Sequence, residues 1–198
     1  MTPPERYRFA HFRLDFAADV EAYLDFAAEY GPDRRTFVKR LSAALMPSLL
    51  ACLLYRLSHL AHSAGHRRTA GALAWINLAA TGAAIAPASR IGAGLYIPHP
   101  STGVVFEGCA GRNLRLFAGS AAGPGFTPLH CGALGAAPRF GDNVSLGAKA
   151  WVQGPVVVGS GARIGFNAVV TRDVAEGARV ASVHVRDRAR PAAQAPSR

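Results

Sequence analysis

The sequence predicts an α+β fold, in which a helical N-terminal part is followed by a stack of short strands. Two patterns predict it. Up to residue 83, apolar residues recur at three- and four-residue spacing, as on one face of a helix. Residues 84–180 are expected to form the second part, because aliphatic residues recur there at every sixth position in runs that end at Val170, which is neither a helical nor an alternating-strand period. Residues 181–198 form a polar, proline-containing tail that we expect to be flexible.

We expect three helices in the first part, because three segments carry apolar side chains at helical spacing and end near glycine or proline. They cover residues 17–30, 34–64 and 67–80. Pro47 would break or kink the second helix. Gly65 is a natural cap for the end of the second helix, and the third ends near Gly82.

The six-residue period is clearest toward the C-terminal end. Its aliphatic positions are Leu146, Val152, Val158, Ile164 and Val170. Two places before each lies a small or β-branched residue, namely Val144, Ala150, Val156, Ala162 or Ala168. A six-residue unit cannot bury its apolar edge alone, so successive coils must stack around a continuous core. The aliphatic column is therefore expected to point inward.

Three breaks interrupt this period. The first break is a change of phase. Ile85, Ile91 and Ile97 keep the six-residue spacing among themselves but lie one residue out of phase with Val104 and the later positions, so one residue is inserted at PHPSTG, residues 98–103. Residues 118–139 are rich in glycine and proline and are expected to leave the stack as a loop. The pattern is lost at residues 173–177, where we expect the stack to end.

The chain is basic: 22 Lys and Arg against 12 Asp and Glu give a net charge of +10. Such a charge suits nucleic acid, an anionic membrane or a polyphosphate ligand. The arginines are scattered and no nucleic-acid-binding motif accompanies them, so we do not expect a nucleic-acid partner. The most apolar segment, residues 41–55, contains Pro47 and is shorter than the ~20 residues that span a bilayer, so a membrane partner is not expected.

The cysteines and histidines also limit the possibilities. Three cysteines at wide spacing and an N-terminus without an apolar signal segment predict a reduced, cytoplasmic protein. His59, His62 and His66 lie close together, but no carboxylate or cysteine on that stretch completes a metal site with them. No metal is therefore expected.

The helical part, the segment IGAGLYIPHPSTGVV and the repeat GDNVSLGAKAWVQGPVVVGSGARIGFNAVV together resemble the serine O-acetyltransferase branch of the hexapeptide-repeat acyltransferases. The resemblance spans roughly residues 33–180. It implies a left-handed parallel β-helix with three short strands in each coil, and a homotrimer or a hexamer made of two trimers. It also implies acetyl transfer from acetyl-CoA, or another acyl-CoA, to the hydroxyl of serine or a related small acceptor. The pantetheine would lie in a groove between neighbouring prisms.

The resemblance also implies roles for two residues on the acceptor side. By position His99 of PHPSTG is the general base, and an imidazole with a pKa near ~6.5 suits proton transfer at neutral pH. Asp33 falls where the family binds the amino group of serine. Asp33 can equally cap the helix that begins at residue 34, and the two roles are compatible.

For the cofactor, the resemblance implies that backbone at four small residues lines the pantetheine groove. These are Gly123, Gly147, Ala148 and Gly165. Arg163 falls where the family has a lysine near the CoA phosphates, and a guanidinium can hold a phosphate through two parallel hydrogen bonds. The corners of such a prism need glycine whether or not anything binds there.

The sequence departs from the family at several supporting positions. The carboxylate that orients the catalytic histidine falls at Ala84, and the acid before that histidine is Pro98. The Arg-His pair that grips the serine carboxylate falls at residues 136–137, both alanine. Losing the carboxylate that orients a histidine base can cost several orders of magnitude in rate.

Other residues are candidates to compensate. Glu107, eight residues after His99, is a candidate to support the base. His130, in the expected loop, is a candidate to replace the missing pair, although a loop histidine is more often a surface residue. Two alternatives stay open: a catalytically degenerate trimeric scaffold, and an acetyltransferase for another acceptor such as a glycan or natural product.

Overall fold

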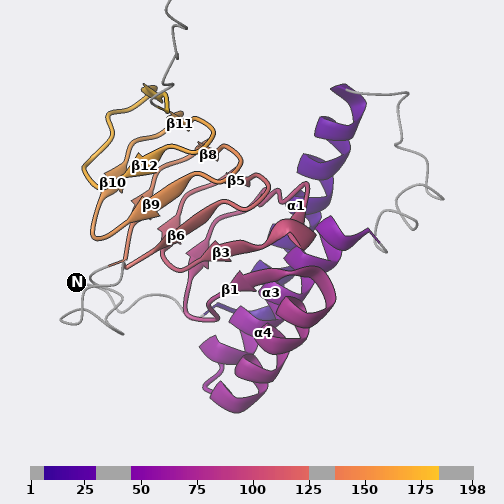
Figure 1. Ribbon diagram of the computed structural model, residues 1–198. Coiled ribbons are helices and arrows are strands. Elements are labelled where there is room, and N and C mark those ends of the chain that lie inside the picture. Colours follow the sequence, from indigo (N-terminus) through magenta and orange to yellow (C-terminus); the bar gives the residue numbers. More distant parts are fainter. Residues whose placement is uncertain (1–6, 30–45, 125–136, 183–198) are drawn as a thin grey trace, which may run out of the picture.

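The computed structural model of the chain describes residues 7–29, 46–124 and 137–182 (Figure 1). Asp33 and His130 lie outside the described residues, as do most of the expected loop and tail. Helices gather at one end of a prism of short strands, and the later strands extend away from them. This is the predicted fold class, and it is confirmed.

Three helices precede the prism: α1 (Phe9–Glu29), α3 (Pro47–Ser63) and α4 (Arg67–Thr81). Pro47 is the first residue of α3 and not a kink within it, which fits a residue that has no amide N–H to donate. Gly65 and Gly82 follow α3 and α4 with φ values of 89° and 80°, as predicted for residues that end helices.

Helix α1 begins earlier than expected. The sequence pattern placed its start at residue 17, whereas the structure starts the helix at Phe9. Phe9, Phe12 and Phe16 lie at three- and four-residue spacing, and their rings stack at 5.6 and 6.2 Å. This aromatic stripe continues the helical period and explains the additional turns.

The prism has three faces, each a parallel sheet. Face 1 consists of β1 (Ala83–Ile85), β3 (Val104–Phe106), β6 (Ala121–Gly123), β9 (Trp151–Gln153) and β12 (Val169–Val170). Face 2 consists of β2 (Arg90–Ile91), β4 (Cys109–Ala110), β7 (Arg139–Phe140) and β10 (Val157–Val158). Face 3 consists of β5 (Arg115–Leu116), β8 (Ser145–Leu146), β11 (Arg163–Ile164) and β13 (Arg179–Val180).

The register shows how the six-residue period produces three faces. Ser145 pairs with Arg163, and Trp151 pairs with Val169, each 18 residues further along the chain. One full coil is therefore three six-residue units. The predicted inward column is confirmed, since its five aliphatic residues and the five small residues before them are all buried in one core cluster.

The structure corrects two expected boundaries of the prism. Strand β6 lies at Ala121–Gly123, so the chain leaves the prism later than residue 118. The coil also continues past residues 173–177, because β13 pairs with β11 beyond them. Asp173 accepts a hydrogen bond from the amide of Val157, and Gly177 turns the corner with φ 66°. Val174 and Val180 of this coil pack against the core, but they pair with residues 16 positions earlier and not 18, so they lie outside the six-residue phase.

The helices pack on the first coil. Helix α4 lies against β1, and α3 packs on both α1 and α4. Side chains of α3 reach prism carbonyls: the Ser48 hydroxyl donates to Ile97, and the Tyr55 hydroxyl donates to Ser89 over 3.0 Å. Within the described ranges, no helix is both long enough and apolar enough to cross a bilayer.

Candidate functional site

His99 lies at the corner that leads from face 3 into β3 of face 1. It precedes a short 3₁₀ helix, Pro100–Thr102, which takes up the inserted residue of the repeat. The His99 carbonyl accepts hydrogen bonds from the Thr102 amide at 3.3 Å and the Thr102 hydroxyl at 2.7 Å. The imidazole is exposed, and none of the described residues hydrogen-bonds to it. Its two ring nitrogens are thus accessible to a ligand.

The corners between faces 3 and 1 stack into one edge of the prism, which we call the histidine edge. It is made of residues 97–103, 117–120, 147–150 and 165–168. The Thr102 hydroxyl accepts from the Gly119 amide at 3.1 Å. The next two coils are joined by the Lys149 amide donating to Ala118 and the Asn167 amide donating to Ala148, at 2.8 and 2.9 Å.

Three of the predicted cofactor residues, Gly147, Ala148 and Gly165, lie on this edge together with His99. The two glycines are required by the stacking of the coils. A Cβ atom at Gly147 would lie 2.9 Å from the Ile164 carbonyl oxygen, and one at Gly165 would lie 2.8 Å from that of Val180. Backbone therefore approaches backbone closely along the edge, which leaves main-chain groups on its outer surface.

Amide groups on the histidine edge are left without acceptors. Among the described residues, nothing accepts a hydrogen bond from the main-chain N–H of Ala118, Ala148 or Phe166. At the matching place on the edge between faces 2 and 3, side chains satisfy two of the amides. There the Arg112 amide donates to Asp142, and the Asp142 amide donates to Ser160. The histidine edge thus presents a row of free donors, whereas on the other edge two of the amides, those of Arg112 and Asp142, have side-chain acceptors.

Glu107 does not lie beside His99 within one chain. The two residues flank opposite ends of β3, so three strand residues, roughly 10 Å, separate them. The Glu107 amide donates to Ala122, and Gly123 accepts from the Gly154 amide at 3.0 Å. Gly123 therefore lies at the same end of face 1 as Glu107, away from the other predicted cofactor residues.

Glu107 instead lines a hollow of about 370 Å³ between α4 and face 1. Trp75 and Leu78 form the helix side of this hollow, and Ala84 and Val105 form its prism side. Glu107 is the charged residue among the described residues that line it. The hollow thus brings Glu107 to Ala84, the position at which the resemblance expects an orienting carboxylate.

Arg163, the predicted phosphate ligand, is exposed on β11 of face 3, two residues before Gly165. Of the missing Arg-His pair, residue 136 lies outside the described residues and Ala137 is buried. No group of three or more His, Cys, Asp or Glu within the described ranges is arranged to hold a metal ion.

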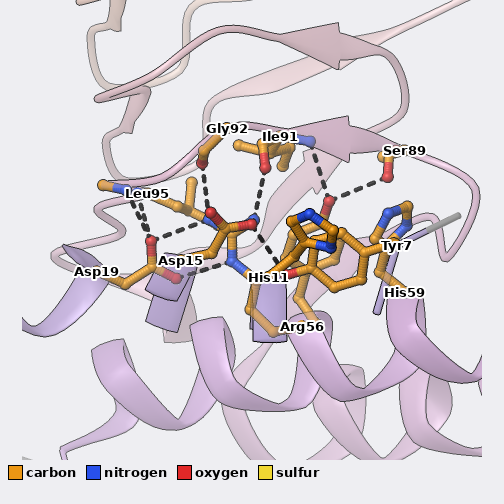
Figure 2. Close-up of polar contacts among 12 residues, drawn as sticks. Tyr7, His11, Asp15, Asp19, Arg56, His59, Ser89, Ile91, Gly92 and Leu95 are labelled. Atoms are coloured by element: carbon orange, nitrogen blue, oxygen red, sulfur yellow. Dashed lines mark hydrogen bonds and ion pairs between the residues drawn. The ribbon is translucent and has the colours of Figure 1, made fainter. Parts of the chain in front are cut away.

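One polar cluster was not predicted from the sequence (Figure 2). Arg56 of α3 is fully buried, and its Nε and Nη2 atoms each donate over 2.9 Å to the Asp19 carboxylate of α1. The same carboxylate accepts from the amides of Gly94 and Leu95 at 3.0 and 2.7 Å. Arg56 also donates to the carbonyls of residues 91 and 92 in the first coil. The cluster thereby fixes two helices to the start of the prism.

Burial raises the pKa of the Asp19 carboxyl, although the Arg56 charge and the donors around it oppose the rise. Burial alone would lower the pKa of Arg56, but the attraction of Asp19 raises it above its ordinary value. Since Arg56 therefore keeps its proton and Asp19 accepts four hydrogen bonds, the cluster holds a buried ion pair. An acidic residue on α1 and an arginine inside an apolar helix were the available sequence signals.

His59 lies at the border of this cluster. Its Nδ1 atom is 2.9 Å from the Pro87 carbonyl oxygen, and because a carbonyl only accepts, Nδ1 carries the proton. Burial lowers the pKa of His59, and the charge of Arg56 lowers it further, while the hydrogen bond to Pro87 opposes the change. His59 therefore packs the helices on the first coil as a neutral side chain.

The chain is similar to known serine acetyltransferases. It is 36% identical over 141 residues to a serine acetyltransferase of Helicobacter pylori strain J99, which covers 67% of this chain and 76% of that protein. A crystal structure of serine acetyltransferase from Neisseria gonorrhoeae matches 88% of this chain with a TM-score of 0.76 and 26% identity. Soybean serine acetyltransferase complexed with serine matches 88% with a TM-score of 0.75 and 27% identity. No family model matches the chain. The chain spans 65% and 68% of the length of these two structures.

Proposed function

The chain belongs to the serine acetyltransferase family, and we propose that it transfers the acetyl group of acetyl-CoA to the hydroxyl of serine or of a related small acceptor. His99 is the general base of this proposal. The observation that carries it is the common edge: an accessible imidazole and a row of free amide donors lie on the same edge of the prism. Such a row suits the carbonyl groups of a pantetheine chain, which only accept hydrogen bonds.

In the proposed reaction, the His99 imidazole takes the proton of the acceptor hydroxyl as the hydroxyl oxygen attacks the thioester carbonyl. A C–O bond forms, the C–S bond of the thioester breaks, and the imidazolium returns the proton to the departing CoA sulfur. The acetyl group passes directly to the acceptor, with no covalent enzyme intermediate. A main-chain N–H of the histidine edge is suited to hold the oxyanion that develops on the thioester oxygen.

The proposal places the pantetheine along the histidine edge beside Gly147, Ala148 and Gly165, and the CoA phosphates at Arg163. The close stacking at the two glycines and the exposed guanidinium of Arg163 support this arrangement. On the acceptor side, Asp33 and His130 remain proposed contributors. Glu107 is proposed to act on the acceptor and not as the group that orients His99 of its own chain, because β3 separates them.

An apolar column on face 1 supports the proposed homotrimer, or a hexamer made of two trimers. Val105, Ala121, Trp151 and Val169 occupy successive in-register positions. Three of them are large and exposed, and Trp75 of α4 is exposed beside the same face. Exposed apolar patches of this kind mark interfaces. Light scattering in solution should therefore give three or six times the 20.7 kDa of one chain, and a monomer would contradict the proposal.

A cytoplasmic setting also belongs to the proposal. Cys52 and Cys109 are free thiols in the described part of the chain, as in a reduced compartment.

A second candidate function is a non-catalytic trimeric scaffold. Ala84 and Pro98 stand where the family has supporting carboxylates, and the His99 imidazole has no partner among the described residues to fix its orientation. The same loss also favours a third possibility, an acetyltransferase for a different biosynthetic acceptor.

Thiol release from acetyl-CoA separates these candidates. The wild-type chain should release CoA thiol with serine or with one of a set of small hydroxyl-bearing amines. A His99→Ala variant should lose about 10²- to 10⁴-fold in rate, the usual contribution of a general base. His66→Ala is the control, because His66 is exposed at the start of α4, away from the histidine edge. A wild-type chain that neither binds CoA by calorimetry nor releases thiol would favour the scaffold, whereas release with a non-serine acceptor alone would favour the third possibility.

A further inference from the structure

The outer surface of face 3 carries a column of basic side chains, which we call the arginine ladder. In order along the prism it contains Arg115, Ser145, Arg163 and Arg179. These residues are in register on adjacent parallel strands, so neighbours are about 4.8 Å apart along the column. All three arginines are exposed, and Arg163 and Arg179 occupy directly adjacent positions.

The ladder has no acidic counterpart. No carboxylate pairs with Arg163 or Arg179 within the described residues. Like charges placed opposite one another on neighbouring strands destabilise a sheet. Two unpaired arginines in that arrangement are therefore a cost to folding unless an anion occupies the space between them.

Face 2 shows that this arrangement is specific to face 3. The matching outer column there is Arg90, Cys109, Arg139 and Val157. Its arginines are separated by uncharged residues, so Arg139 has no like-charged neighbour on either side. The chain is thus arginine-rich on both faces, but only on face 3 do two arginines meet.

The ladder adjoins the histidine edge. Strand β8 runs directly into Gly147 and Ala148, and β11 runs directly into Gly165. A ligand that lies over the edge at these coils is therefore within reach of the arginines of face 3. The Ser145 hydroxyl adds a neutral donor beside Arg163.

We propose that Arg179, which the resemblance does not assign, joins Arg163 in binding the phosphate groups at the nucleotide end of CoA and makes the site selective for phosphate-bearing thioesters. This inference rests on the proposed function, since it takes CoA to be the ligand of the histidine edge. Two guanidinium groups on adjacent strands can each hold a phosphate oxygen pair through parallel N–H groups. The bound phosphates offset the repulsion between the two arginines, which explains why no carboxylate accompanies them.

The test compares Arg179→Ala with Arg139→Ala, a change of the same residue type and exposure on the face without an adjacent arginine. Titration calorimetry with CoA should show affinity reduced about tenfold in Arg179→Ala, within the range expected for a charge-assisted hydrogen bond, and unchanged in Arg139→Ala. Arg179→Lys should recover part of the loss. The dependence of CoA affinity on salt should also weaken in Arg179→Ala, because one cation–phosphate contact is gone.

Two further readouts keep the inference separate from a folding defect and from the proposed function. Arg179→Ala should unfold at the same temperature as the wild type or higher, since it removes a repulsive neighbour. S-acetylpantetheine, which lacks the nucleotide phosphates, should react with equal kcat/KM in both proteins. If the wild type binds CoA and Arg179→Ala binds it equally well, this inference fails while the proposed function stands. The inference also fails if Arg179→Ala loses as much activity with S-acetylpantetheine as it loses with acetyl-CoA. If the wild type does not bind CoA, both fail.

Discussion

Replacing Asp19 with alanine would leave the Arg56 guanidinium buried without its main carboxylate. Arg56 is completely buried, and both of its 2.9 Å hydrogen bonds to Asp19 would be lost. Breaking a buried ion pair by removing one partner costs about 3–5 kcal/mol, since the remaining charge is uncompensated. The amides of Gly94 and Leu95 also lose their acceptor. Because domains are stable by only about 5–15 kcal/mol, we expect Asp19→Ala to lower the free energy of unfolding by a large fraction.

Guanidinium unfolding followed by circular dichroism measures this change through the midpoint and slope of the transition. The control is Arg112→Ala, which removes an exposed pair at 3.5 Å between side chains that are 73% and 39% accessible. Exposed pairs contribute about 0–1 kcal/mol, so the control should change little. Asp19→Asn keeps the shape of the carboxylate, so its loss of unfolding free energy should lie between those of Asp19→Ala and Arg112→Ala. This variant provides a measurement if Asp19→Ala does not fold. An Asp19→Asn effect no larger than that of the control would refute the reasoning.

Three further predictions concern the helices and the corners. Burial lowers the pKa of His59 below its ordinary 6.5, so the unfolded chain takes up a proton there more readily than the folded chain does. The free energy of unfolding should therefore decrease as the pH is lowered from about 7.5 to about 5.5, and His59→Gln should make that decrease smaller. Lys149 adopts φ 56°, a left-handed backbone conformation that costs residues with a side chain about 1–2 kcal/mol. Lys149→Gly should therefore raise the thermal unfolding midpoint by the equivalent of about 0.5–1 kcal/mol. An unchanged midpoint would argue against backbone strain at this residue. Gly94→Ala should lower the thermal midpoint, because φ is 84° and the added Cβ would clash with the Asn113 side chain, whereas Gly154→Ala, at a similar φ but in open space, should lower it less.

The prism could be predicted because its rule is local and repeated. Each aliphatic residue of the column from Leu146 to Val170 fills the same place in the core, so five successive coil positions report one geometry. The inserted residue at PHPSTG was visible for the same reason, as a change of phase, and the structure takes it up in the short 3₁₀ helix. The last coil was missed because it is two residues shorter than the coils before it. Val158 pairs with Val174 and Ile164 pairs with Val180, each 16 residues further along, so its core-facing apolar residues fall out of the six-residue phase.

The site was less accessible to sequence reasoning. The position of His99 follows from the repeat, but its distance from Glu107 depends on which end of β3 each residue flanks, and an eight-residue spacing suggested proximity that the strand prevents. The Asp19–Arg56 pair joins residues 37 positions apart on two helices whose packing no local pattern specifies. The free amides of the histidine edge emerge only when the hydrogen bonds of every corner are traced.

A structure of the chain with CoA bound would test the central claim most directly. The account predicts that the pantetheine lies along the histidine edge, that its carbonyl oxygens accept from the amides of Ala118 or Ala148, and that the thiol lies within about 4 Å of the His99 imidazole. CoA bound along another edge of the prism, with its sulfur remote from His99, would contradict the assignment of the base and of the groove together.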